Sequence, residues 1–139
     1  MKSFILPVEF ESAKKYLLDL EKYPTWSSNF VSCIPFGDKY LIEISASQLV
    51  EKIEVAVTRN ENGMKISGTG NQLVRNFELY WELIDAGKLE DGTPQTRVEY
   101  EFSLNTKFPT PSFMKNAMEN KFISQIIQDV IASISPLGK

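Results

Sequence analysis

The sequence of 139 residues contains no histidine and a single cysteine, Cys33. Without histidine the chain lacks the usual general base near neutral pH and the commonest transition-metal ligand. One cysteine excludes an intramolecular disulfide, a thiolate zinc site and a CxxC redox pair. Because no histidine is present to generate its thiolate, Cys33 is expected to be a buried apolar side chain. We therefore predict no catalytic residue, no metal site and no cofactor.

Long apolar runs and an excess of positive charge are also missing. No segment reaches the roughly 20 apolar residues of a membrane-spanning helix. The apolar start of the chain ends at Pro7 and Glu9, too early for the core of a signal peptide. We expect a cytoplasmic protein without membrane insertion. The 15 Lys and Arg residues are outnumbered by 18 Asp and Glu residues, giving a formal charge of −3, so nucleic acid is not an expected partner.

The length and composition are those of a globular protein. Hydrophobic residues make up 42% of the chain and charged residues 24%, which excludes a disordered or fibrous protein. A chain of this length builds one core, and it shows no internal repeat or linker. One domain is therefore predicted over residues 1–139.

The first part of the chain indicates a strand followed by a helix. Apolar residues alternate over residues 2–10, which predicts a strand with one buried face, and Pro7 places it at a sheet edge. The apolar spacing then becomes helical, which predicts a helix over residues 12–22, ended by Tyr23-Pro24. A short second helical turn is expected over residues 25–29.

The middle of the chain alternates with period two and predicts hairpin-linked strands. Six are expected, over residues 30–36, 40–45, 52–59, 64–69, 77–84 and 97–104. Asn62-Gly63 is the strongest hairpin signal, because both residues tolerate the positive φ of a type I′ turn. Gly68-Thr69-Gly70 is interpreted as a bulge or turn, Gly70-Asn71 as a further turn, and residues 85–95 as a polar loop.

The last part predicts one long helix between Pro111 and Pro136. Apolar residues recur every four positions from Met114 to Ile134, with further apolar positions beside them, so the stripe is too wide for a coiled coil. Such a helix must cover the inner face of the sheet. Consecutive hairpins and one covering helix predict an α+β fold, an antiparallel sheet curled around a single helix.

The predicted inner face of the sheet is apolar. No carboxylate or lysine is expected in phase with it, and the phenols of Tyr40 and Tyr100 are its polar groups, so an acid/base site is not indicated. Its other members are Ile42, Ile44, Ile53, Val55, Val57, Met64, Ile66, Phe77, Leu79, Trp81, Val98 and Phe102. The outer, solvated face is expected to carry Glu78, Glu82, Glu99 and Glu101.

Residues 17–26 read Leu-Leu-Asp-Leu-Glu-Lys-Tyr-Pro-Thr-Trp, after a strand and helix and before the hairpins and the long helix. In this pattern the chain resembles the START/SRPBCC (birch-pollen-allergen-like) superfamily, within it the polyketide cyclase/dehydrase-like and coenzyme-Q-binding-like branches. The resemblance implies a helix-grip fold with a seven-stranded antiparallel sheet around the C-terminal helix. It also implies two short helices between the first two strands and an apolar cavity between sheet and helix.

A cavity of this kind implies that the protein binds a small hydrophobic ligand, such as a lipid, an isoprenoid or an aromatic polyketide. The residues expected to line it are Trp26, Tyr40, Ile42, Val55, Ile66, Leu79, Trp81, Tyr100, Phe102, Met114, Met118 and Phe122.

Two other functions stay open. A polyketide cyclase or dehydratase would need an acid or base turned inward, for which Glu43, Glu54 and Lys65 are the candidates. A protein-interaction module, such as the ribosome-associated toxin-like relatives, would have a protein partner, an exposed apolar patch and no enclosed cavity.

Overall fold

The computed structural model describes residues 1–46, 49–70 and 72–134. Seven strands form one antiparallel sheet in the order β1-β7-β6-β5-β4-β3-β2. The elements are β1 (Lys2–Leu6), α1 (Phe10–Leu17), the 3₁₀ turn η1 (Leu20–Lys22), α2 (Tyr23–Trp26), β2 (Phe30–Phe36), β3 (Lys39–Ala46), β4 (Leu49–Arg59), β5 (Gly63–Gly70), β6 (Val74–Lys88), β7 (Pro94–Thr106) and α3 (Ser112–Ile134).

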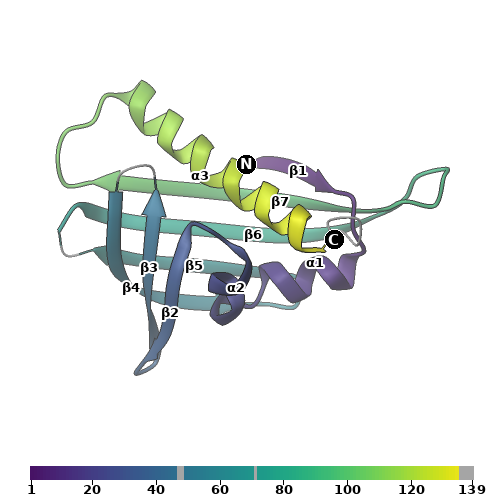
Figure 1. Cartoon of the computed structure of the whole chain (residues 1–139), viewed down its shortest axis with the longest axis horizontal. Coiled ribbons are helices and arrows are strands. Elements are labelled where there is room, and N and C mark those ends of the chain that lie inside the picture. Colours follow the sequence, from purple (N-terminus) through teal and green to yellow (C-terminus); the bar gives the residue numbers. More distant parts are fainter. Residues whose placement is uncertain (47–48, 71, 135–139) are drawn as a thin grey trace.

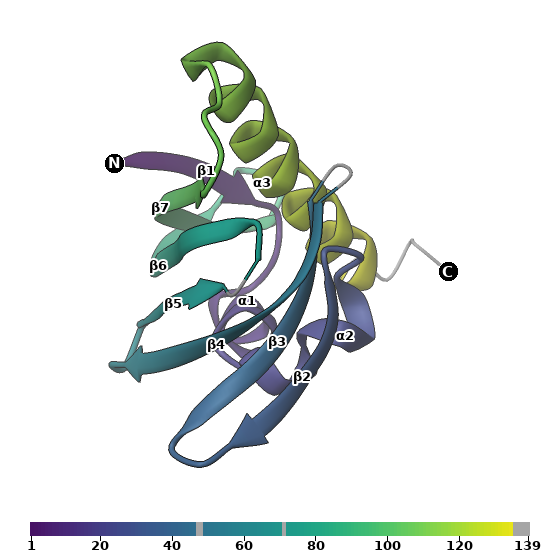
Figure 2. The same cartoon turned by 90° about the vertical axis from the view of Figure 1, so that its left-hand side faces the viewer.

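The sheet is curled, and α3 crosses its open side (Figures 1 and 2). The short helices α1 and α2 lie between the first two strands and near the C-terminal end of α3 (Figure 1). The predicted α+β helix-grip fold is therefore confirmed. The boundaries of the domain, residues 1–139, stay a prediction.

The register of the strands brings the predicted inner-face residues together. Opposite one another are Tyr40 and Val55, Ile42 and Ile53, Val57 and Ile66, Met64 and Trp81, and Leu79 and Phe102. A slip of one residue would turn each of these side chains to the other face. The alternation in the sequence thus predicted the inner face correctly, and β2 spans the predicted residues 30–36.

Two predicted elements near the N-terminus are wrong in their extent. The first strand ends at Leu6 instead of residue 10, and Phe10 begins α1. The helix predicted over residues 12–22 is divided into α1 and η1. Tyr23-Pro24 begins α2 instead of ending a helix, because proline fits the first helical turn, where its missing N–H has no intrahelical acceptor.

The predicted polar loop over residues 85–95 is largely strand. β6 continues to Lys88 and β7 begins at Pro94, and the tip is closed by the N–H of Leu89, which donates to the carbonyl of Thr93 (2.9 Å). Residues 85–92 are exposed on both faces, and residues 93–95 are half-buried. A strand segment without a buried face needs no alternation of apolar and polar residues. The sequence pattern therefore could not reveal these ends of β6 and β7.

The hairpin between β4 and β5 exists, but its predicted type I′ turn is wrong. Gly63 is not among the positive-φ glycines, which are Gly37, Gly87 and Gly92. Instead the side-chain oxygen of Asn60 accepts the N–H of Asn62 (3.0 Å). Glycine is needed at position 63 because there is no room for a side chain: a Cβ there would lie 2.8 Å from the carbonyl oxygen of Trp81.

The glycines around Thr69 are not a bulge or turn. Gly68 and Gly70 pair in regular register with Val55 and Ile53 of β4. A Cβ on Gly68 would collide with the carbonyl oxygen of Glu54, so the close approach of the strands explains this glycine. The predicted turn at Gly70-Asn71 includes Asn71, which lies outside the described residues.

One carboxylate faces the interior, against the expectation of a purely apolar face. Glu51 precedes Ile53 by two positions on β4 and is 7% exposed. Its oxygens accept the N–H groups of the β5–β6 connection, from Gln72 (2.9 Å), Leu73 (2.6 Å) and Val74 (3.0 Å). A Cβ on Gly70 would collide with this carboxylate. Glu51 is therefore a structural residue that closes the β5–β6 connection.

A second polar contact ties the short helices to the sheet. The buried hydroxyl of Tyr23 donates to the carbonyl of Leu17 (2.5 Å) and accepts the Nε1–H of Trp81 (2.8 Å). Burial raises the pKa of Tyr23 well above its ordinary value, so the hydroxyl remains a donor. One side chain thereby joins α2 to α1 and β6.

Glu51→Gln should destabilise the protein by more than about 2 kcal/mol, since hydrogen bonds to a charged acceptor are worth roughly 1.5–3 kcal/mol and an amide offers one oxygen in place of two. Glu54→Gln is the matched control, because Glu54 is exposed and pairs with Lys39 at 3.4 Å. It should cost less than about 1 kcal/mol. Urea unfolding measures both, and equal midpoints would contradict the structural role of Glu51.

Tyr23→Phe should lower the free energy of unfolding by about 1–3 kcal/mol, because it leaves the buried N–H of Trp81 without an acceptor. Tyr80→Phe is the control. Its hydroxyl donates to Glu82 at an exposed position (2.7 Å), so its loss should change stability by less than about 0.5 kcal/mol. A Tyr23→Phe protein as stable as the control in urea would show that the Tyr23 contact contributes nothing.

Candidate ligand-binding site

The helix α3 consists of two halves that differ in burial. All of its buried residues, Phe122, Ile123, Ile126 and Val130, fall in the second half. Over residues 112–121 no side chain is buried, and Phe113 and Met114 are 73% and 52% exposed. Figure 2 shows this N-terminal half rising away from the sheet.

Hydrogen bonds anchor the C-terminal half to the α2–β2 connection. Asp129 Oδ2 accepts the N–H and the hydroxyl of Ser28 (2.8 and 2.9 Å). The buried side-chain amide of Asn29 donates to the carbonyl of Phe122 (2.8 Å). The helix is thus fixed from Phe122 onward.

Aromatic rings pack against one another between α3 and the sheet. Phe102 and Phe122 stack with centroids 4.7 Å apart and planes 11° apart. Phe77 lies edge-on to both, at 5.5 and 6.0 Å, and Phe30 contacts Phe122 at 5.8 Å. These four rings form a packed layer between α3 and the sheet, as expected for a close-packed interior.

The predicted lining residues therefore fall into three groups. Ile42, Val55, Ile66, Leu79, Trp81 and Phe122 are buried in the core. Trp26, Tyr40, Tyr100, Phe102 and Met118 are partly buried against it, and Met114 is exposed. The structure does not bring the twelve together around one space. Tyr100, Phe102 and Met118 border the pockets next to the N-terminal half of α3.

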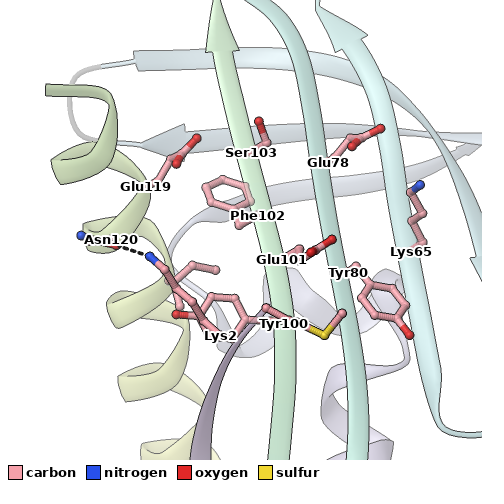
Figure 3. A pocket seen from close by; sticks show the side chains of 12 residues that line it. Lys2, Lys65, Glu78, Tyr80, Tyr100, Glu101, Phe102, Ser103, Glu119 and Asn120 are labelled. Carbon is pink, nitrogen blue, oxygen red and sulfur yellow. Dashed lines mark hydrogen bonds between the residues drawn. The ribbon is translucent and has the colours of Figure 1, made fainter. Parts of the chain in front are cut away.

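The larger pocket, here called the edge pocket, lies where β1 stops covering β7. Their pairing ends at Lys2 and Tyr100, and beyond this point a pocket of about 710 Å³ opens beside the uncovered edge of β7. Figure 3 shows Lys2, Tyr100, Phe102 and Asn120 around it. Lys2 Nζ donates to the side-chain oxygen of Asn120 (3.3 Å).

The edge pocket combines apolar surface with a few polar groups. Phe102 and Ile123 supply apolar walls, while Lys2, Asn120 and the phenol of Tyr100 supply donors. Burial raises the pKa of Tyr100, which keeps this hydroxyl protonated. The pocket also continues over the outer face of the sheet to Lys65, Glu78, Tyr80, Glu101 and Ser103 (Figure 3).

A second pocket of about 490 Å³, here called the tip pocket, lies between the ends of β6 and β7 and the first turns of α3. Leu104, Lys115 and Met118 are among its lining residues. Glu119 of the edge pocket accepts the N–H of Leu104 (2.9 Å) and pairs with Lys115 (2.6 Å). Glu119, which lines the edge pocket, is therefore in contact with Leu104 and Lys115, which line the tip pocket.

The candidates for acid/base chemistry do not face the interior. Glu43, Glu54 and Lys65 each stand on the face opposite the buried residues of their strands. On the outer face Arg97 pairs with Glu99 (3.1 Å). Among the described residues no group of three His, Cys, Asp or Glu side chains could hold a metal ion.

Trp26 packs beside the short helices. Its ring lies 4.8 Å from Tyr23 and 6.1 Å from Tyr16. Its Nε1–H is buried and has no hydrogen-bond partner in residues 1–46, 49–70 and 72–134. This position is remote from the edge and tip pockets, so a ligand-binding role for Trp26 stays a prediction.

Cys33 is half-buried on β2, less deeply than expected. Burial, assisted by the negative charges of Glu21 and Asp19, raises the pKa of its thiol to about 11. The thiol is therefore protonated at neutral pH and a poor nucleophile.

Comparison with known proteins identifies the fold. No family model and no curated protein matches the sequence. A START superfamily protein from Mycobacterium smegmatis superimposes with a TM-score of 0.77 and 15% identity, over 98% of this chain and 96% of that one. The Zhui aromatase/cyclase from Streptomyces sp. R1128 gives 0.72 and 8%, over 99% and 93%. The Bet v 1-like protein Ara h 8.0201 gives 0.63 and 11%, over 99% and 96%.

The chain thus has the START/SRPBCC fold, as the resemblance in its sequence implied. Identities this low show the fold alone, and function has to be argued from the site. In the described part of the chain no helix is long and apolar enough to cross a membrane.

Iodoacetamide should alkylate Cys33 at least roughly tenfold more slowly at about pH 8 in the folded protein than in the urea-unfolded chain, since a raised pKa lowers the thiolate fraction. The ultraviolet absorbance of the thiolate should rise with a midpoint near 11. Equal alkylation rates in both states would contradict the raised pKa, and faster alkylation of the folded protein would show an activated thiol and reopen a catalytic role for Cys33.

Proposed function

We propose that this protein binds one small hydrophobic molecule beneath the N-terminal half of α3. The observation that carries the proposal is the unburied apolar stripe of this half, in which Met114 and Met118 remain outside the core. The edge and tip pockets border it. Methionine side chains adapt to irregular guests. The START/SRPBCC fold supports this class of function. We further propose that the protein is cytoplasmic.

The site differs from the predicted one in its depth. Because the layer of Phe30, Phe77, Phe102 and Phe122 closes the interior, a guest would lie against the outer rim of this layer. Its apolar body would contact Phe102, Met118 and Ile123. The donors of Lys2, Asn120 and Tyr100 suit a guest with one polar end. We therefore favour an amphiphilic guest, with a carbonyl or hydroxyl at one end, over a pure hydrocarbon.

An aromatase/cyclase-type enzyme is the second candidate, favoured by the likeness to Zhui and to the di-domain aromatase/cyclase StfQ (TM-score 0.61, 10% identity, 95% of this chain and 44% of that one). Lys2 and Glu119 are titratable groups at the edge pocket, but Glu119 already binds Leu104 and Lys115. Mass spectrometry of a molecule that co-purifies with the protein distinguishes the two. A binding protein returns its guest unchanged, and an enzyme returns it with an altered mass.

Met118→Trp tests the site. The indole would occupy the tip pocket, so the free energy of unfolding should stay within about 0.5 kcal/mol of the wild type, while uptake of a hydrophobic fluorescent probe should be lost. Overpacking a filled core would instead cost about 1–3 kcal/mol.

Asn116→Trp is the matched control, since Asn116 is exposed on the same helix, and it should keep both stability and uptake. Clear destabilisation by Met118→Trp, with probe uptake unchanged, would refute a guest site beneath this half of α3.

A further inference from the structure

The inner face of the sheet carries a lysine at its uncovered edge. Lys2 is in phase with Phe4 and Leu6 of β1, and Leu6 is fully buried. Since the side chains of a strand alternate between its two faces, Lys2 stands on the same face as these residues. Its cross-strand partner is Tyr100. The expectation that no lysine lies in phase with the inner face is therefore wrong at this position.

The ammonium group of Lys2 is only partly engaged by the protein. Its Nζ donates to the side-chain oxygen of Asn120 (3.3 Å), which is a neutral acceptor. Within residues 1–46, 49–70 and 72–134 Lys2 forms no ion pair. An ammonium group has three donors, so Lys2 can donate to a further acceptor while it keeps its contact with Asn120.

The phenol hydroxyl of Tyr100 is a second available donor beside Lys2. It has no hydrogen-bond partner in the part of the chain that the structure describes. The ring is held by Phe4 and Trp81, with centroids 5.6 and 6.1 Å away, so the position of the hydroxyl is fixed. Figure 3 shows Lys2 reaching from β1 toward Asn120 of α3, next to Tyr100. The two donors therefore stand together at the edge pocket.

The carboxylates of the edge pocket do not neutralise Lys2. Glu119, on the inner side, already accepts a backbone N–H (2.9 Å) and pairs with Lys115 (2.6 Å). Glu78 and Glu101 are exposed on the outer face of the sheet. On the inner side of this pocket, Lys2 is therefore the cation with which a guest can pair.

We propose that the polar end of the guest is a carboxylate, held by Lys2 and Tyr100. This inference rests on the proposed function and narrows the class of guests to amphiphilic acids. A carboxylate accepts several hydrogen bonds, and its charge strengthens those from an ammonium group and a phenol. A neutral hydroxyl or ester would leave the ammonium group without a counter-charge. The apolar body of the acid would lie along Phe102 and Ile123, which line the same pocket.

Fluorescence titration with pyrenedecanoic acid and with its methyl ester tests the proposal, because the two probes share an apolar body and differ at the polar end. The wild type should bind the acid at least roughly fivefold more tightly than the ester. The net charge of the chain is −3 and repels an anion, so a preference for the acid requires a local cation.

Two variants assign this preference to its donors. Lys2→Gln should lower the affinity for the acid roughly fivefold and leave the affinity for the ester unchanged. Tyr100→Phe keeps the ring and should lower the affinity for the acid roughly threefold. The matched control is Lys52→Gln, which removes the same charge from an exposed position on the outer face of β4. It should bind both probes like the wild type, and urea unfolding checks that all three variants are folded.

The outcomes separate this proposal from the one on which it rests. Equal affinities of the wild type for acid and ester would overturn the carboxylate and leave guest binding intact. A Lys2→Gln protein that binds the acid as tightly as the Lys52→Gln control would overturn the role of Lys2. If neither probe binds, guest binding itself fails, and this proposal fails with it.

Discussion

The stacking of Phe122 on Phe102 determines how the rest of the molecule is arranged. The centroids of the two rings lie 4.7 Å apart, and the backbone carbonyl of Phe122 accepts a hydrogen bond from the side-chain amide of Asn29. The helix is therefore held against the concave face of the sheet at one residue by both apolar and polar contacts. Residues that follow Phe122 pack into the core, and residues that precede it project beyond the sheet. The division of α3 into two halves is a direct consequence of this contact.

The projecting half retains an apolar stripe that the core does not use. Burial of apolar surface stabilises a protein by roughly 25 cal/mol for each Å² removed from water. An exposed apolar stripe lacks this stabilisation, which indicates a binding partner outside the fold. Met118 faces the tip pocket, while Phe113 is almost free of contacts at 73% exposure. Because successive positions of a helix point in different directions, this short segment turns Met118 toward the tip pocket and Phe113 toward solvent.

Sequence patterns predicted those features that depend on the difference between a buried and a solvent-exposed face. The alternation of Phe77, Leu79 and Trp81 located the inner face of β6, and residues 17–26 with the order of elements indicated the fold. The same alternation could not distinguish a filled interior from a hollow one, since Phe102 and Phe122 are apolar in either case. Glu51 was missed although it is in phase with Ile53, because its hydrogen-bond donors lie 21 to 23 residues away. Such a closure depends on tertiary contacts that local spacing does not contain.

Glu119 connects the exposed N-terminal half of α3 to the sheet. Among the described residues no strand pairs with this edge of β7 beyond Tyr100, and an uncovered edge invites pairing with other chains. Glu119 covers part of it by accepting the N–H of Leu104, and Lys115 balances its charge. This contact holds the N-terminal half of α3 near the sheet without burying it. Its separation would cost one charge-assisted hydrogen bond and a partly exposed ion pair, about 1–3 kcal/mol. The aromatic layer beneath would remain intact, so the proposed guest could enter at its rim while the stability of the fold rests on the other half of the helix.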